Sequence, residues 1–136
     1  MLFRKNTVVI SKYTNPFQNI TLGTYISRKH SLSDSDKNIL LLSTSRSSVL
    51  IGHNQNCWAE CNTNLMRTDG ISLVRRDTGG GACYVDKGTR LFSFINKSNK
   101  KSYPIILSAM HSLNIGAELM GRNDIVVNNK KTNYKS

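Results

Sequence analysis

The sequence is poor in acidic and aromatic residues and has no long apolar segment. Its 136 residues include 8 acidic and 19 basic side chains, so the formal net charge is 19 − 8 = +11. The longest apolar run covers only residues 39–42, far below the roughly 20 residues of a membrane-spanning helix. The cysteine count is 3, an odd number that disfavours a disulfide framework and favours a reducing compartment. A transmembrane protein, a collagen and a disulfide-dense mini-protein are therefore excluded.

The excess of basic residues calls for an anionic partner or a solvated basic surface. Strongly basic chains often bind nucleic acid, acidic proteins or phosphate-bearing small molecules. Here the lysines stand in short, separate groups, which is more typical of a solvated face than of a binding stripe. Aromatic residues make up 7% and are not clustered, so a basic nucleic-acid-binding module is the last of the alternatives.

The pattern of apolar residues predicts one α+β domain with a mixed or mainly antiparallel sheet. Helical spacing predicts three helices, and β-branched or apolar runs predict strands between them. Residues 82–84 and 91–95 are expected to form a hairpin, and Asn128 and Asn129 a tight turn with positive φ. The expected helices cover residues 18–27, 58–66 and 103–113, and the other expected strands residues 7–10, 39–42, 49–51, 71–74, 117–119 and 125–127.

Residues that could bind a ligand are most concentrated in the segment RRDTGGGACY. Three consecutive glycines, residues 79–81, let a loop backbone approach a ligand closely and turn its N–H groups towards an anion. Arg75 and Arg76 could add forked hydrogen bonds to phosphate or carboxylate, and Thr78 adds a hydroxyl. The segment has neither Walker nor dinucleotide-binding spacing. It indicates an anion-binding loop, with a flexible hairpin turn as the alternative.

A second cluster holds His53, Cys57 and Cys61 at a spacing of four residues. On one continuous helix they would share a face and resemble zinc ligands. The polar residues before Trp58 argue that the helix starts after His53, and isolated cysteines are commonly small buried apolar residues. Buried thiols are therefore preferred over a zinc site.

A third cluster precedes and follows the last expected strand. Asn123 and Asp124 stand before it, and the turn brings Lys130 and Lys131 back beside it. Strand alternation can place one lysine on the same face as the Asn-Asp pair. A carboxylate near a lysine suits metal or phosphate chemistry, and equally an ordinary hairpin salt bridge.

In this order, four segments resemble the lipoate–protein ligase and lipoyltransferase family: NPFQNITL, IGHNQNCWAECN, RRDTGGGACYVDKG and GRNDIVV. The match covers residues 13–131. The resemblance implies the fold of biotinyl and lipoyl ligases, related to class II aminoacyl-tRNA synthetases. It also implies that residues 1–136 are a truncated catalytic domain, with its C-terminal half and any accessory domain absent from this sequence.

The same resemblance implies an enzyme that uses ATP, Mg²⁺ and lipoate. Lipoate would attack ATP to give lipoyl-adenylate and pyrophosphate, and the lipoyl group would then pass to a lysine of an acceptor domain. The implied acceptors are the lipoyl domains of 2-oxoacid dehydrogenase complexes and the glycine cleavage protein, whose acidic character suits a basic surface. Two alternatives stay open: a lipoyltransferase that performs only the second step, and a non-catalytic protein that binds adenylate or lipoate.

The resemblance also carries residue roles. Lys131 matches the catalytic lysine, with Lys130 as the alternative alignment. Lipoate-binding positions are Arg76, Thr78 and Lys131. Asp124 is expected to meet Mg²⁺ through the phosphates. The expected ATP- and adenylate-binding positions are Arg76, Gly79, Gly80, Gly81, Ala82, Cys83, Tyr84, Asn123, Asp124 and Lys131.

Five positions depart from the family pattern. Val85 replaces a histidine, Thr89 an asparagine and His53 an arginine, whereas Gly23 and Thr24 stand where glutamates are usual. The changes at positions 85, 89, 23 and 24 favour the non-catalytic alternative.

The N-terminal segment has an uneven charge distribution. The first acidic residue is Asp34, and basic and hydroxyl residues precede it. This composition resembles a mitochondrial transit segment, although residues 7–10 read as a strand. Together with the usual place of the family in eukaryotes, it predicts a mitochondrial location, with the cytoplasm as the alternative.

Overall fold

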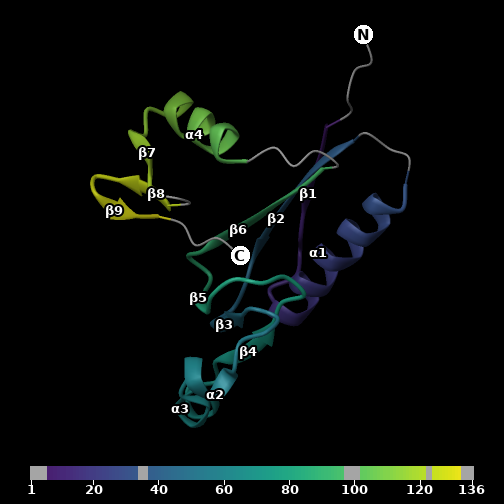
Figure 1. Ribbon diagram of the computed structural model, residues 1–136, viewed down its shortest axis with the longest axis vertical. Coiled ribbons are helices and arrows are strands. Elements are labelled where there is room, and N and C mark those ends of the chain that lie inside the picture. The colour runs from purple at the N-terminus through teal and green to yellow at the C-terminus, as the bar shows by residue number, and fades with distance from the viewer. Residues whose placement is uncertain (1–5, 34–36, 97–101, 122–123, 133–136) are drawn as a thin grey trace. The chain divides into compact units, whose positions relative to one another are not determined.

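The computed structural model describes residues 6–33, 37–96, 102–121 and 124–132. The chain divides into two compact units, Met1–Ser98 and Asn99–Ser136, each built from helices and strands (Figure 1). Parallel and antiparallel strand pairs both occur, so the predicted α+β class with mixed sheets is confirmed. No helix in the described ranges is long and apolar enough to cross a membrane.

The first unit contains two three-stranded sheets. In one sheet, β2 (Asn38–Thr44) lies between β1 (Asn6–Ile10), its parallel neighbour, and β6 (Arg90–Ile95), its antiparallel neighbour. In the other, β3 (Ser48–Ile51) lies between the parallel β4 (Ser72–Arg75) and the antiparallel β5 (Cys83–Val85). Every strand predicted in this part of the sequence is present.

Helix α1 (Pro16–Ser31) connects β1 to β2 and is longer than the predicted helix at residues 18–27. The Asn15 side chain caps it by accepting a hydrogen bond from the Phe17 N–H, and Pro16 stands in the first turn, where its missing N–H costs nothing. The buried Asn19 donates through Nδ2 to the carbonyls of Tyr13 (3.1 Å) and Thr44 (2.9 Å). The bond to Thr44 ties the helix to the end of β2, and the bond to Tyr13 ties it to the segment before the helix.

One core cluster of this unit lies on one face of the β3–β4–β5 sheet. Leu50, Val74 and Val85 are 2–3% exposed and contact Ile20 of α1 and Leu91 of β6. Each strand therefore contributes one alternate apolar side chain to the same face, as the period of two requires.

The single helix predicted at residues 58–66 is wrong, because two short helices replace it: α2 (Cys57–Glu60) and α3 (Thr63–Thr68). Cys61 between them has extended backbone (φ −140°, ψ 143°). Asn56 and Asn62 each cap one helix, accepting hydrogen bonds from the N–H groups of Trp58 and Leu65 respectively. The apolar residues in this segment do have helical spacing, but Asn62, the second capping asparagine, starts a new helix.

The hairpin predicted between residues 82–84 and 91–95 is also wrong. β5 pairs with β3, and β6 pairs with β2 in the other sheet. The intervening turn is held by Asp86, whose carboxylate accepts from the Gly88 N–H (2.9 Å) and the Thr89 hydroxyl (3.2 Å). Burial of Val85 against Leu50 decides the pairing of β5, and this contact between distant residues is not visible in the local pattern.

The second unit is a helix followed by a three-stranded antiparallel sheet. Helix α4 (Tyr103–Ser112) packs against β7 (Ala117–Met120) and β8 (Asp124–Val127), and β9 (Lys130–Lys131) pairs with β8. Its core holds Tyr103, Ala117 and Ile125. Asn128 and Asn129 have φ angles of 52° and 61°, so the predicted positive-φ turn is confirmed.

Candidate functional site

The glycine-rich loop between β4 and β5 is organised around the buried side chain of Arg76. This side chain is 6% exposed, and its Nη2 donates to the carbonyls of Gly79 (3.1 Å) and Gly81 (2.8 Å). Its Nη1 donates to Cys83 Sγ (3.6 Å). The Nε atom is buried without a hydrogen-bond partner, and among the described residues no carboxylate forms an ion pair with this guanidinium. A buried cation with an unused donor favours an anion as its partner.

The loop lies directly against the end of β3. The His53 N–H donates to the Thr78 carbonyl (2.9 Å), and the Arg76 N–H donates to the Ile51 carbonyl (2.9 Å). A Cβ atom placed on Gly52 would lie 2.1 Å from the Gly80 carbonyl oxygen. Glycine is therefore required at position 52, because the two backbones touch, and in the loop Gly80 has a φ of 103°, which also favours glycine. The structure thus joins the IGHNQN and RRDTGGG segments, which are distant in sequence, into one feature.

Arg75 does not face a ligand site as the sequence had suggested. Its Nη1 donates to the carbonyls of Gly52 (3.0 Å), His53 (2.9 Å) and Gln55 (2.7 Å). The Gln55 side chain in turn accepts from the Gly52 N–H (2.8 Å). Arg75 therefore holds the 52–55 turn, and of the two consecutive arginines it is Arg76 that has a buried nitrogen without a hydrogen-bond partner.

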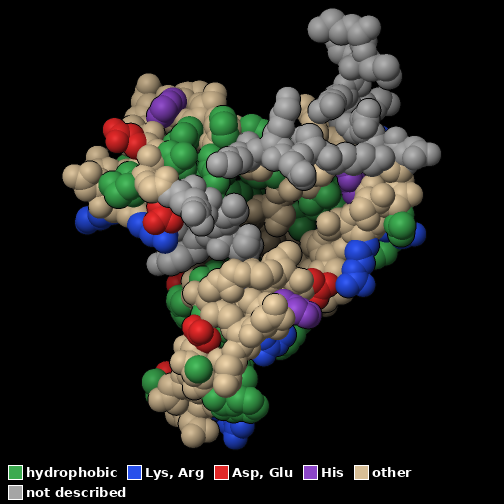
Figure 2. Space-filling model, viewed as in Figure 1, with side chains coloured by type: hydrophobic (Ala, Val, Ile, Leu, Met, Phe, Trp, Pro, Cys, Tyr) green, Lys and Arg blue, Asp and Glu red, His purple; other side chains and the backbone are tan. Residues whose placement is uncertain are grey.

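The outer rim of the loop is tied to α1. Arg28 Nη2 lies 3.0 Å from Asp77 Oδ2, with both side chains more than half exposed (75% and 52%). An ion pair this exposed contributes little stability, about 0–1 kcal/mol. On the face shown in Figure 2, the Lys and Arg side chains form small separate groups within each unit, as their scattered spacing predicted.

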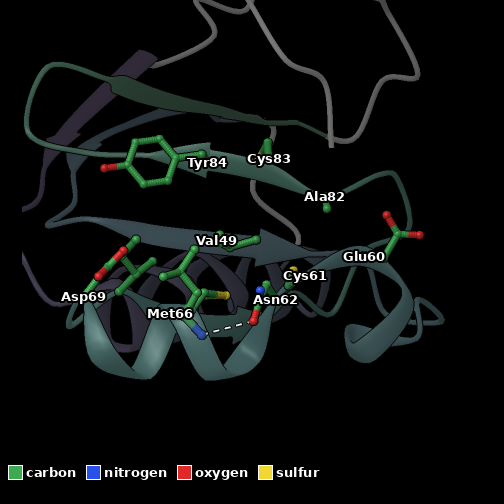
Figure 3. Close-up of a pocket in the computed structure, with 11 residues that line it drawn as sticks. Val49, Glu60, Cys61, Asn62, Met66, Asp69, Ala82, Cys83 and Tyr84 are labelled. Carbon is green, nitrogen blue, oxygen red and sulfur yellow. Dashed lines mark hydrogen bonds between the residues drawn. The ribbon is translucent and has the colours of Figure 1, made fainter.

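A cavity of about 340 Å³ opens beside β5, on the face opposite the core (Figure 3). Tyr84 of β5 pairs with Val49 of β3, and helix α3 forms the facing wall. The lining is mainly apolar, with carboxylates at its edge. It consists of Val49, Glu60, Cys61, Asn62, Leu65, Met66, Asp69, Ile71, Ala82, Cys83 and Tyr84. Three of the predicted adenylate-binding positions, residues 82–84, thus border one cavity.

The cysteine cluster does not form a metal site in the described part of the chain. Helix α2 begins at Cys57, after His53, so the three residues do not share one helical face. No group of three or more His, Cys, Asp or Glu side chains in the described ranges could hold a metal ion. Burial, and next the negative charge of Glu60 and then Cys57, raises the pKa of the Cys61 thiol. The raised pKa favours the protonated thiol, which is not the form that binds a metal.

The second unit carries the other predicted site residues. Lys131 Nζ lies 3.0 Å from Asp124 Oδ1, with the side chains 43% and 44% exposed. Lys131 pairs in register with Val126, two residues from Asp124, so the lysine and the aspartate share a face. Lys130 pairs with Val127 and lies on the opposite face. Asn123 lies outside the described residues.

The family departures have structural consequences. Val85 is a core residue at 2% exposure, and a histidine there would have to be hydrogen-bonded. Thr89 closes the Asp86 turn. Gly23 faces Leu41, with 3.6 Å between an added Cβ and Leu41 Cδ2. His53 contacts the loop through its backbone alone in the described hydrogen bonds.

Comparison with known proteins identifies the family. Residues 15–132 match the lipoyl protein ligase A/B catalytic domain, and the chain belongs to this family. It is 38% identical over 132 residues to the lipoate-protein ligase A of Blochmanniella floridana, covering 94% of this chain and 38% of that protein. The crystal structure of Plasmodium falciparum LipL1 in complex with lipoate is similar with a TM-score of 0.83 and 32% identity over 93% of this chain and 42% of that chain.

A crystal structure of lipoate-protein ligase A bound with ATP is also similar. The TM-score is 0.68 and the identity 27%, over 96% of this chain and 59% of that chain. The chain thus spans between 38% and 59% of the length of these three proteins. Its fold is that of the corresponding part of a lipoate-protein ligase.

Gly52 and Gln55 organise the site but were not assigned to it from sequence, and Arg75, expected to bind a ligand, instead holds the 52–55 turn. These residues act through contacts with backbone groups, and the residue types along the sequence do not reveal such contacts. Only the glycine of IGHNQN could have indicated a close approach of two backbones.

Proposed function

We propose that this chain is the nucleotide-loop part of a lipoate–protein ligase. In the first step, a lipoate carboxylate oxygen attacks the α-phosphorus of ATP, and the bond to the leaving pyrophosphate breaks. In the second step, a lysine amine of an acceptor domain attacks the carbonyl carbon of lipoyl-adenylate. An amide forms, AMP leaves, and the amine loses a proton.

One observation carries the proposal: the buried, unpaired Nε of Arg76 inside the triple-glycine loop. Because its two other nitrogens are used by loop carbonyls and a thiol, the guanidinium is held rigidly before a ligand arrives. A carboxylate or phosphate oxygen at this position would gain a charge-assisted hydrogen bond in a poorly solvated setting. The exposed Thr78 hydroxyl is proposed to help bind the lipoate carboxyl end.

The adenylate is proposed to contact the loop backbone at Gly79, Gly80 and Gly81 and then residues 82–84. The cavity bordered by residues 82–84 has apolar walls and two edge carboxylates, Glu60 and Asp69. Such a lining suits a neutral base and disfavours phosphate groups. We therefore propose that the base binds in the cavity beside residues 82–84 and that the phosphates lie against residues 79–81.

The second unit is proposed to supply charge to the reacting groups. The positive charge of Lys131 would stabilise negative charge on carboxyl and phosphate oxygens, a contribution of about 2.7–4 kcal/mol for one preorganised donor. Asn123 and Asp124 are proposed to face the adenylate. The Asp124 carboxylate is a suitable oxygen ligand for Mg²⁺, which would reach it through the phosphates and neutralise their charge.

The proposed acceptors are lipoyl domains of 2-oxoacid dehydrogenase complexes and of the glycine cleavage protein. Their acidic surfaces would complement a chain with a net charge of +11. The absence of acidic residues before Asp34 supports a mitochondrial location, with the cytoplasm as alternative. Imaging of a fluorescent fusion of the full chain would decide between them.

Thermal unfolding of the chain with and without ATP, Mg²⁺ and lipoate tests the ligand sites. A ligand at about 100 times its dissociation constant adds about 2.7 kcal/mol to the stability of a folded binder. For a chain of this size the midpoint should rise by several degrees. A cooperative transition that does not move with any combination of these ligands would refute the proposal.

The departures at positions 85, 89, 23 and 24 support a second candidate, a binding protein without catalysis. Lys131→Ala separates the two, with lipoate-dependent pyrophosphate release from ATP as the assay. Turnover in the parent chain that disappears in the variant, with binding retained, supports the ligase. Transfer from synthetic lipoyl-adenylate without pyrophosphate release from ATP would indicate a transfer-only enzyme, and no turnover in either chain the binder.

A further inference from the structure

One face of the β7–β8–β9 sheet carries three charged side chains and the buried Val126 (6% exposed), placed there by strand register. Glu118, Val126 and Lys131 lie in one row across the three strands. Asp124 precedes Val126 by two residues and therefore lies on the same face, diagonal to Lys131. The opposite face carries Ala117 and Val127 towards the core.

Among the described carboxylates, Asp124 forms an ion pair with Lys131. The distance between Asp124 Oδ1 and Lys131 Nζ is 3.0 Å, within the range of a charge-assisted hydrogen bond. Glu118 is separated from Lys131 by the whole width of β8, two strand spacings or about 10 Å. Glu118 and Asp124 thus lie on the same face, but Asp124 contacts Lys131 and Glu118 does not. The two carboxylates therefore form a matched pair for experiment.

The aspartate itself is held in place by the core. The adjacent Ile125 is 1% exposed and contacts Tyr103 and Ala117. The Thr132 N–H and hydroxyl both donate to the Ile125 carbonyl, at 2.8 and 2.9 Å. Burial, and next the charge of Asp124, raises the pKa of the Tyr103 phenol, as expected if the carboxylate is oriented near that ring. The backbone next to Asp124 is therefore fixed by the core.

We infer that Asp124 is a positioning residue for Lys131, in addition to any contact with ligand. A lysine side chain has four rotatable bonds, and holding it in one conformation costs entropy. A carboxylate fixed by the core limits that freedom before the ligand arrives, so the ammonium group is already oriented when it meets a carboxyl or phosphate oxygen. This inference rests on the proposed role of Lys131, but the contact itself is testable without it.

The test uses the full chain with ¹³C-dimethylated lysines, in which Lys131→Arg identifies the Lys131 methyl signal. Asp124→Asn should move this signal towards those of the exposed lysines in the unliganded chain, and Asp124→Glu should restore much of its position. Glu118→Gln removes an equal charge from the same face and should leave the signal unchanged. Binding of ATP with lipoate should weaken about two- to fivefold in Asp124→Asn alone, the range of a half-exposed ion pair.

An unmoved Lys131 signal in Asp124→Asn would overturn the inference, as would an equal movement in Glu118→Gln. Weaker ligand binding with an unmoved signal would overturn it too, and would make Asp124 a direct ligand contact. If the parent chain binds neither ATP nor lipoate, the proposed function fails. The signal comparison still decides the contact, because it is made without ligand.

Discussion

Gly52→Ala should displace the glycine-rich loop, because two backbones meet at this position. The added Cβ would lie 2.1 Å from the Gly80 carbonyl oxygen, 3.1 Å from the Gly80 carbonyl carbon and 3.3 Å from the Gly79 carbonyl carbon. Ordinary contact for a Cβ starts at 3.4 Å. The oxygen must therefore move by 3.4 − 2.1 = 1.3 Å, and backbone atoms cannot do this by changing a rotamer.

The expected loss of stability is about 1–3 kcal/mol, the range for an added methyl group in a packed site. If the loop moves as a unit, the bonds at risk are those from Arg76 to the carbonyls of Gly79 and Gly81 and that from the His53 N–H to the Thr78 carbonyl. Ligand binding should then suffer more than stability, since the Arg76 guanidinium would lose its fixed orientation.

Two measurements on the same protein test this reasoning: urea unfolding, and titration with ATP and lipoate. Gly81→Ala is the control for stability, because no heavy atom lies within 4 Å of its added Cβ. Gly116→Ala, equally unobstructed and in the second unit, is the control for binding. A Gly52→Ala protein with the unfolding midpoint and affinities of the parent chain would refute the close contact.

Three further predictions follow from other contacts. Arg76→Lys should lower the free energy of unfolding by about 1–3 kcal/mol, measured by urea unfolding. The single ammonium nitrogen cannot replace both Nη2, which bonds the loop carbonyls, and Nη1, which bonds Cys83 Sγ. An unchanged midpoint would show that these bonds do not hold the loop. Glu60→Gln should speed the alkylation of Cys61 by iodoacetamide, measured by peptide mass spectrometry. Glu60 helps to raise the pKa of this thiol, so loss of its negative charge should lower that pKa. An equal alkylation rate in the variant and the parent chain would contradict that cause. Asn129→Val should destabilise the β8–β9 turn by about 1–2 kcal/mol, whereas Asn129→Gly should be tolerated, because φ is 61° at this position. Amide hydrogen exchange measures both effects. Equal exchange in the two variants would exclude a left-handed turn.

The sequence predicted local structure well where the signal is short-range. The strands at residues 7–10 and 125–127, the helix after Asn15 and the positive-φ turn at Asn128 and Asn129 all follow from propensity, capping and turn chemistry. The errors concern choices between partners. The helix predicted at residues 58–66 divides because the Asn62 side chain caps a new helix, and β5 pairs with β3 because Val85 packs against Leu50.

For the candidate site, the triple-glycine segment and its arginines were recognisable because their chemistry is local. Strand alternation also limited the choice between Lys130 and Lys131, and the observed register puts Lys131 beside Asp124. The sequence could not show that Arg75 and Arg76 have different roles. Both are arginines, adjacent in sequence at the end of β4. The positions of the surrounding groups make Arg75 a tie for the 52–55 turn and Arg76 a buried cation.

The sequence by itself determined the family, the α+β class and the order of the motifs, because these depend on residue type and spacing along the chain. Only the tertiary structure decided that Gly52 touches Gly80, that Arg76 is buried with an unpaired Nε, and that the cavity beside β5 lies between residues 82–84 and α3. Each of these depends on distances between segments far apart in sequence. Such distances follow from how the core packs, and local pattern carries no record of them.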